Sequence, residues 1–548
     1  MNKNIRILES KSAKGDILAT FSLFNIFHSG LGTDIDLTKA EKYRSKCYQI
    51  LSNTNEKKLN SRLTIDKIRL KDFRRFRNSE IILHEQLTVI IGINGSGKTS
   101  ITDALAKILS WIPARIESKN KTAKTLNFSD INNHCEDYSE VDAFLKLGEK
   151  NRFTSSLAKP IPGYVHYKVS DLNEFNSLTD LYRSINFYSK NDGINLPIFA
   201  YYSVDRATAT SNSPSNIEKI KESTIRSKFS AYNFALEGTG RYIDFLEWFL
   251  FIDNILHFSN KATNEEINKI QQEIYALQAL NLDQEHSLWS IYEEKTNQLA
   301  TLKNTNKHKN YELYKSQLGA VKKAIFNIIP SIEDIFIDRK SGSAEVKIRN
   351  NGDTVNLNQS SQGQKTLISF VADLTRRLTL LNPYLENPLN GQGIVIIDEI
   401  ELHLHPQWQQ SIVSSLVKTY PNIQFIITTH SPQVLSTVER NSIRQIYETD
   451  DGTLDIKTPI FQTRGVQSTD ILEKIMGTNS IPDVKEARDT DMFFSLLQEK
   501  RKKEAEELLI QLENHFNKYE GQDHPVISNC KNHLRIFEMK IRMQNNKG

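Results

Sequence analysis

The sequence predicts an α/β protein with helical segments at both ends and in the middle. Three short, strongly apolar runs predict buried strands at 87–91, 394–397 and 424–429. The first run is followed by a glycine-rich loop and then by an amphipathic helix that contains Leu105 and Leu109. Buried strands that are each followed by a helix are typical of a mainly parallel sheet.

Composition and charge exclude several classes of protein. With 38% hydrophobic and 25% charged residues, 14 Pro and 22 Gly, the chain is neither collagen-like nor wholly disordered. No run approaches the roughly 18 consecutive apolar residues of a membrane span, and residues 1–6 carry no apolar leader. Three widely spaced cysteines exclude a disulfide framework. We therefore expect a cytoplasmic protein without a membrane contact. A net charge of +4 neither requires nor excludes nucleic acid.

A phosphate-binding loop follows the strand at 87–91. Residues 92–99 are Gly-Ile-Asn-Gly-Ser-Gly-Lys-Thr, the G-x-x-x-x-G-K-[ST] pattern of a P-loop between a strand and a helix. We expect Lys98 to reach the β- and γ-phosphates and Thr99 to offer its hydroxyl to Mg²⁺. The backbone N–H groups of the loop and the positive N-terminal end of the helix also point toward the phosphates. The predicted nucleotide-binding residues of this segment are Asn94, Gly95, Ser96, Gly97, Lys98, Thr99 and Ser100.

Two carboxylates follow the strand at 394–397. We predict that Asp398 belongs to the Mg²⁺ site, as Thr99 does, and that Glu399 polarises the attacking water. Adjacent acids at a strand end can instead cap a helix, but the P-loop upstream favours the catalytic role.

Two further motifs complete the predicted site. The strand at 424–429 ends at His430, which we expect to donate to a γ-phosphate. Upstream, a Ser-x-Gly turn precedes an amphipathic helix and predicts a second anion site at a helix N-terminus, made of Ser361, Gly363 and Gln364.

The order of these motifs resembles the ABC-type ATPase family, and within it the SMC, Rad50, RecF and OLD-like branch. The resemblance covers about 65–110 and 355–435 and implies an ABC-type P-loop NTPase head that binds ATP and Mg²⁺ and hydrolyses ATP. It implies catalytic roles for Lys98, Glu399 and His430. Ile68–Phe76 resembles the strand edge that contacts the nucleotide in that branch. Because Arg75 stands where a serine is usual, only Arg74 is carried over.

The resemblance also implies an assembly. In this family, signature serines bind a nucleotide that is held by the P-loop of another subunit. This chain has one P-loop and one signature segment, at 361–364. We therefore expect a homodimer or a higher homo-oligomer, in which Ser361, Gly363 and Gln364 touch the ATP of a partner.

We predict five segments in the chain. They are a helical extension that resembles one Sel1-like repeat (1–60), an N-terminal half of the head with an inserted lobe (61–250), a helical insertion with a short coiled coil (251–330), a C-terminal half of the head (331–480) and a helical tail for partner docking (481–548). Within the insertion, Ile267, Ile270, Ile274 and Leu277 have coiled-coil spacing, and we expect the basic residues at 303–309 near its apex.

Contact with nucleic acid is open at this stage. The aromatic runs at 196–203 and 245–249 suit stacking on bases, and Arg206 suits a phosphate, but such runs are more often core. The basic residues at 303–309 suit either DNA or a solvated turn.

The motifs, the short insertion and the tail look most like the PtuA family, the ATPases of Septu anti-phage defence systems, in the form encoded with retrons. This resemblance implies a separate HNH nuclease partner similar to PtuB, and it leaves open a reverse transcriptase with its msDNA as further partners. No intrinsic nuclease is expected. One alternative is an OLD-type nuclease, for which Asp489-Thr490-Asp491 supplies half of the metal motif. The other is a RecF- or Rad50-like DNA repair ATPase.

Overall fold

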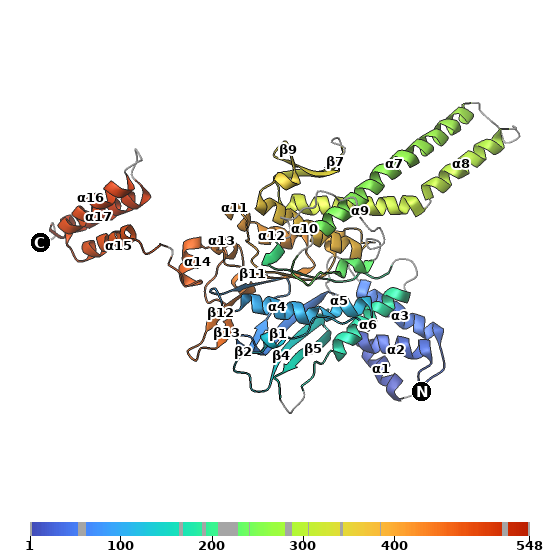
Figure 1. The fold of residues 1–548 in the computed structure, drawn as a ribbon, viewed down its shortest axis with the longest axis horizontal. Coiled ribbons are helices and arrows are strands. Elements are labelled where there is room, and N and C mark those ends of the chain that lie inside the picture. Colours follow the sequence, from blue (N-terminus) through green and yellow to red (C-terminus); the bar gives the residue numbers. More distant parts are fainter. Residues whose placement is uncertain are drawn as a thin grey trace. The chain divides into compact units, whose positions relative to one another are not determined.

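A computed structural model gives the fold of the chain. It describes residues 3–52, 62–163, 168–188, 193–206, 228–239, 242–279, 288–304, 306–339, 344–383, 385–479, 481–517 and 524–545. The chain forms two compact units, Met1–Ser468 and Thr469–Gly548. The first unit contains the sheets and every motif of the predicted site (Figure 1).

A six-stranded sheet forms the centre of the first unit, in the order β13-β12-β3-β11-β10-β6. All its pairs are parallel except that of β12 and β13. Its strands are β3 (Leu87–Ile91), β6 (Ile198–Tyr202), β10 (Gly393–Ile397), β11 (Ile423–Thr428), β12 (Ile443–Glu448) and β13 (Leu454–Lys457). The three strands predicted from apolar runs are therefore neighbours. Because they are parallel, the motifs that follow them meet at one edge of the sheet.

Helices cover both faces of this sheet. In Figure 1, α4 (Lys98–Leu109) and α5 (Trp111–Glu117) lie below it, and α10 (Gln362–Leu381) and α12 (Ile412–Thr419) lie above it. The short helices α11 (Pro406–Gln409) and α13 (Pro432–Leu435) follow β10 and β11. The α/β fold class predicted from the sequence is confirmed.

A second, antiparallel sheet lies on the other side of α4 (Figure 1). Its order is β2-β1-β4-β5, with β1 (Leu63–Phe73), β2 (Phe76–Ile82), β4 (Tyr138–Leu147) and β5 (Asn151–Pro160). The buried amide of Gln424 on β11 joins the two sheets. It accepts from the N–H of Ile65 at 2.8 Å and donates to the carbonyl of Ile65 at 2.9 Å. A small third sheet contains β7 (Ile332–Asp338), β8 (Glu345–Asn350) and β9 (Asp353–Asn356).

Three helices form the N-terminal extension: α1 (Lys3–Ala13), α2 (Ile17–Ser29) and α3 (Leu37–Ser52). The carboxylate of Asp16 caps α2 by accepting from the N–H of Ala19 at 2.9 Å. The N–H of Ile17 donates to Oδ1 of Asn151 at 2.9 Å, and α2 and α3 also contact α6 (Asn173–Tyr188). The extension therefore packs on the rest of the first unit.

The helical insertion is a hairpin of α7 (Tyr242–Gln278) and α8 (Trp289–Asn304), and α8 is followed by α9 (Asn306–Ile328), which packs against α10 (Figure 1). An ion pair of 2.7 Å between Lys295 and Glu273 joins the two arms. The hairpin turns between α7 and α8. The prediction of an apex at 303–309 is therefore wrong. The loosely spaced apolar residues of α8 indicate a helix, but they do not show where the chain reverses. The side chains of Ile267, Lys303, Lys307, His308 and Lys309 lie outside the described residues.

The two aromatic runs belong to the core. Every residue of β6 is buried. On α7, Phe245, Trp248 and Phe249 are at most 1% exposed. The interpretation of these runs as core is therefore the correct one, because rings without exposed faces cannot stack on bases.

The second unit has its own apolar core. Its helices are α14 (Ser468–Lys474), α15 (Lys485–Gln498), α16 (Lys502–Phe516) and α17 (Pro525–Asn545). Phe493, Leu512 and Cys530 lie in the core that α15, α16 and α17 share. Asp489 and Asp491 lie within α15 and not at the end of a strand. Among the described residues, no helix combines the length and apolarity that a membrane crossing requires.

Candidate functional site

The glycine-rich loop connects β3 to α4. Gly95 and Gly97 have φ angles of 76° and 94°, which residues with a side chain rarely adopt. A Cβ on Gly97 would also lie 2.8 Å from the ring of Phe76. The loop bends back on Lys98, whose Nζ donates to the carbonyls of Gly92 and Ile93, each at 3.0 Å. Burial lowers the pKa of Lys98, while Asp398, Glu399 and Glu401 oppose that shift.

The side chains of this loop fit a phosphate. The Oγ of Ser96 is buried and has no hydrogen-bond partner in the structure. Such a hydroxyl requires a ligand or water. The ammonium of Lys98 donates to the backbone carbonyls of Gly92 and Ile93. Asn94 and Gly95 are exposed at the loop tip. A polyphosphate would therefore meet a hydroxyl, an ammonium and the N–H groups at the start of α4.

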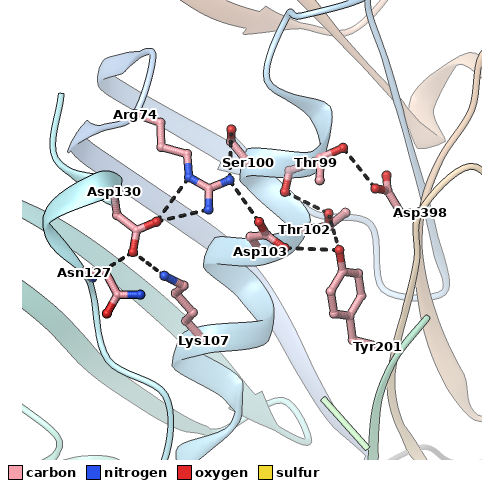
Figure 2. A network of polar contacts seen from close by, with 10 residues as sticks. All are labelled: Arg74, Thr99, Ser100, Thr102, Asp103, Lys107, Asn127, Asp130, Tyr201 and Asp398. Atoms are coloured by element: carbon pink, nitrogen blue, oxygen red, sulfur yellow. Dashed lines mark hydrogen bonds and ion pairs between the residues drawn. The ribbon is translucent and has the colours of Figure 1, made fainter. Parts of the chain in front are cut away.

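The predicted metal ligands lie together although they are 299 residues apart in the sequence. The hydroxyl of Thr99 donates to Oδ2 of Asp398 at 3.0 Å, as Figure 2 shows. The other oxygen, Oδ1, accepts from the hydroxyl of Thr428 on β11. Because Mg²⁺ prefers carboxylate and hydroxyl oxygens, this pair fits the ion expected beside a nucleotide phosphate.

Glu399 adopts an unusual backbone conformation at the end of β10. Its φ of 48° lies in the left-handed region. Its N–H donates to the Thr428 hydroxyl at 2.8 Å, and its carbonyl accepts from Nη2 of Arg206 at 2.5 Å. Arg206 also donates to the carbonyl of Asp398. Arg206 is 6% exposed, so our suggestion that it reaches the phosphate of a nucleic acid is wrong.

Glu401 fixes the segment that carries His430. One carboxylate oxygen of Glu401 accepts from the hydroxyl of Thr429 at 2.7 Å, and the other accepts from the N–H of His430 at 2.5 Å. Burial, followed by the charge of Lys98, lowers the pKa of His430 from 6.5. The imidazole is therefore neutral at pH 7 and retains one N–H that can donate to a ligand.

The predicted signature segment begins α10. Oγ of Ser361 caps the helix by accepting from the N–H of Gln364 at 3.3 Å. A Cβ on Gly363 would lie 2.3 Å from the carbonyl oxygen of His403, so only glycine allows this close approach. The turn thus packs against the loop that follows Glu399. Ser361 itself is exposed.

Arg74 and Arg75 lie in the β1–β2 turn and have different partners. Arg74 is part of the network in Figure 2, where it forms ion pairs with Asp103 at 2.9 Å and Asp130 at 3.0 Å. It also lies 3.4 Å from the Oγ of Ser100. Arg75, which the sequence comparison set aside, donates to the carbonyl of Gly95 at 2.6 Å. Arg75 is therefore the one whose side chain contacts the glycine-rich loop directly.

Tyr201 at the end of β6 extends the network toward the metal ligands (Figure 2). Its hydroxyl donates to Asp103 at 3.2 Å and lies 3.4 Å from Oγ1 of Thr102, which donates to the carbonyl of Thr99 at 3.0 Å. Burial raises the pKa of Tyr201 well above its usual value. Sequence reasoning placed Tyr201 only in the aromatic run at 196–203 and did not single out Thr102, because neither stands at a motif position.

Comparisons with known proteins agree with this geometry. Residues 64–435 match the family described as AAA ATPase domain. The retron Vc95 probable ATPase of Vibrio cholerae serotype O1 biovar El Tor is 32% identical over 86% of this chain and 89% of its own length. The retron Ec83 probable ATPase of Escherichia coli is 31% identical over 80% of each chain. The Septu protein PtuA of Bacillus mycoides strain KBAB4 is 28% identical over 42% of this chain and 32% of its own length.

The domain match covers the P-loop, the signature segment, Asp398, Glu399 and His430 together. Because the domain match spans more than half of the chain and the Vc95 relative aligns along most of both sequences, this chain belongs to the AAA ATPase family that includes the retron Vc95 and Ec83 probable ATPases, and it is an ATPase.

Proposed function

We propose that this chain is an ATP-switched subunit of an anti-phage defence complex, acts in the cytoplasm and controls a separate HNH nuclease. The observation that carries the ATP site is the 3.0 Å contact between Thr99 and Asp398, beside the buried Lys98. The names of the retron and Septu relatives support the defence role. A retron reverse transcriptase, its msDNA and a contact with nucleic acid belong to the same proposal.

In this proposal, each group of the site has its own role in ATP hydrolysis. The loop N–H groups, Ser96 and Lys98 bind the phosphates, and Thr99 and Asp398 hold Mg²⁺, which neutralises charge on the phosphate oxygens when it is bound. The carboxylate of Glu399 orients the attacking water and accepts its proton. His430, neutral at pH 7, donates from its ring to the γ-phosphate.

The second part of the proposal is a homodimer, or a higher homo-oligomer built from such dimers. Ser361, Gly363 and Gln364 of each subunit contact the ATP held by the other. The exposure of Ser361 at the N-terminus of a 20-residue helix supports this arrangement, because the positive end of the helix dipole is accessible there. Closure of the dimer then depends on ATP, and hydrolysis opens it.

Two variants test the ATP switch in cells and in solution. We expect Lys98→Ala to lose ATP binding and Glu399→Gln to bind ATP without hydrolysing it, and both to abolish protection in a plaque assay with the complete operon. Lys418→Ala and Glu386→Gln are matched controls, because both side chains are exposed and lie outside the site. Wild-type protection by both site variants would eliminate the switch.

A separate measurement tests the dimer. Sedimentation of Glu399→Gln with ATP and Mg²⁺ should show at least twice the monomer mass, and omission of ATP should reverse it. Ser361→Arg in the same background should remain monomeric, because a bulky cation replaces the hydroxyl at the interface. An ATP-independent mass for all three samples would refute the interface.

A further inference from the structure

Glu399 carries out its proposed role from a backbone conformation that is unfavourable for a residue with a side chain. A φ of 48° at a non-glycine residue is strained and persists only where neighbours hold it. At this position the carboxylate leaves the strand in a direction that an extended residue would not give. The groups that hold the conformation therefore determine where the carboxylate points.

Arg206, which follows β6, binds the backbone of Asp398 and Glu399. Its guanidinium donates to two consecutive carbonyls, those of Asp398 and Glu399, and its Nη1 donates to the carbonyl of Ser203 at 2.9 Å. A guanidinium has a rigid planar fork of donors, so one side chain fixes two peptide planes at once. An ammonium at the same place has no such fork.

The surroundings of Arg206 suit a charged group although it is buried. Burial lowers the pKa of Arg206 to about 10, and the carboxylates of Asp398, Glu401 and Glu399 oppose that shift, so it is charged at neutral pH. Arg206 donates to the backbone carbonyls of Ser203, Asp398 and Glu399, so these hydrogen bonds do not occupy the carboxylate of Glu399.

We propose that Arg206 is a positioning residue for ATP hydrolysis, which holds the peptides on both sides of Glu399 and so aims the carboxylate. This inference rests on the proposed role of Glu399. It differs from a structural role because it predicts a loss in kcat that disappears when the carboxylate is absent.

Arg206→Lys tests the role with the smallest change. We expect kcat for ATP to fall about 100-fold, the effect of misplacing a reacting group by about 1 Å, while KM changes less than about threefold. Guanidinium ion added to Arg206→Ala should restore part of kcat. Arg377→Lys is the matched control. Arg377 is 1% exposed and donates to the carbonyls of Ala231 and Asn233, away from the site, so it should affect stability more than kcat.

A double-mutant cycle separates this inference from the proposed function. In the Glu399→Gln background, Arg206→Lys should cause no further loss of the single-turnover rate. An equal loss in both backgrounds, a wild-type kcat for Arg206→Lys, or failure of both Arg206 variants to fold would overturn the inference. Wild-type hydrolysis by Glu399→Gln would instead overturn the proposed role of Glu399.

Discussion

Thr428→Val is the substitution that tests the polar contacts behind the site most directly. Thr428 is fully buried on β11. Its hydroxyl donates to Oδ1 of Asp398 and accepts from the N–H of Glu399 at 2.8 Å. Valine has nearly the same shape as threonine but no hydroxyl. The substitution therefore removes both hydrogen bonds and leaves the volume of the core unchanged.

The size of the effect follows from those two bonds. An N–H left without a partner costs about 1–3 kcal/mol, and a lost hydrogen bond to a carboxylate costs about 1.5–3 kcal/mol, so we expect about 3–5 kcal/mol in the free energy of unfolding. The first unit spans Met1–Ser468. Its unfolding entropy, about 2.1 cal/mol/K per residue, converts this loss into a fall in Tm of about 3–5 °C.

Differential scanning calorimetry of the full chain measures the shift, with Thr428→Ser as the control. Serine keeps the hydroxyl and loses one methyl group, which costs about 1 kcal/mol and thus about 1 °C. The kcat for ATP should fall in the valine variant and be retained in the serine variant. A valine variant that melts within a degree of the serine variant would refute the assignment of both hydrogen bonds.

Other substitutions test the remaining contacts. Gly363→Ala places a Cβ 2.3 Å from a backbone oxygen and should lower ATPase activity more than tenfold. Gly319→Ala is the control. A Cβ there would meet open space on α9, so the substitution should raise the free energy of unfolding by about 0.5–1 kcal/mol. Arg74→Ala should lower Tm because it breaks two partly exposed ion pairs at a cost of about 1–2 kcal/mol, while Asp130 keeps its ion pair with Lys107. Arg75→Ala, at an exposed position, should mainly raise KM for ATP. Since burial lowers the pKa of His430, the unfolded chain binds its proton first as pH falls through 6.5, and stability falls. The fall in Tm between about pH 7.5 and about 5.5 should therefore be smaller in His430→Gln.

The parts of the site that depend on neighbouring residues could be predicted from the sequence. Lys98 and Thr99 follow a glycine pattern whose conformation is set locally, between a strand and a helix. Asp398 ends an apolar strand, and parallel pairing brings the ends of such strands together. The meeting of Thr99 with Asp398 thus follows from two local patterns and one rule of sheet geometry.

The remainder depends on contacts that no local pattern encodes. Arg206 binds backbone carbonyls almost 200 residues away, and carbonyls carry no sequence signal. The choice between Arg74 and Arg75 depended on the partners of each side chain, which are Asp103 and Asp130 for Arg74 and the carbonyl of Gly95 for Arg75. The hairpin apex was misplaced for a similar reason, since apolar spacing indicates a helix face but not where the chain reverses.

The loop from Glu399 to His405 contacts the segment after β6, the end of β11, His430 and the signature turn. Its start is held by Arg206 and Thr428, its Glu401 carboxylate holds the N–H of His430, and its His403 carbonyl touches Gly363. Internal hydrogen bonds, from the N–H of Leu402 to the carbonyl of Glu399 at 3.0 Å and from Leu404 to Glu401 at 2.8 Å, make it a compact turn.

A compact turn moves largely as one piece, because a shift at one end cannot be absorbed without breaking its internal hydrogen bonds. If the signature turn of one subunit closes on the ATP of another, Gly363 presses on this loop in its own subunit. The loop carries Glu399 and restrains His430, so closure at one nucleotide adjusts the hydrolytic groups at the other. In the proposed dimer, the close contact between Gly363 and the His403 carbonyl would link the two sites.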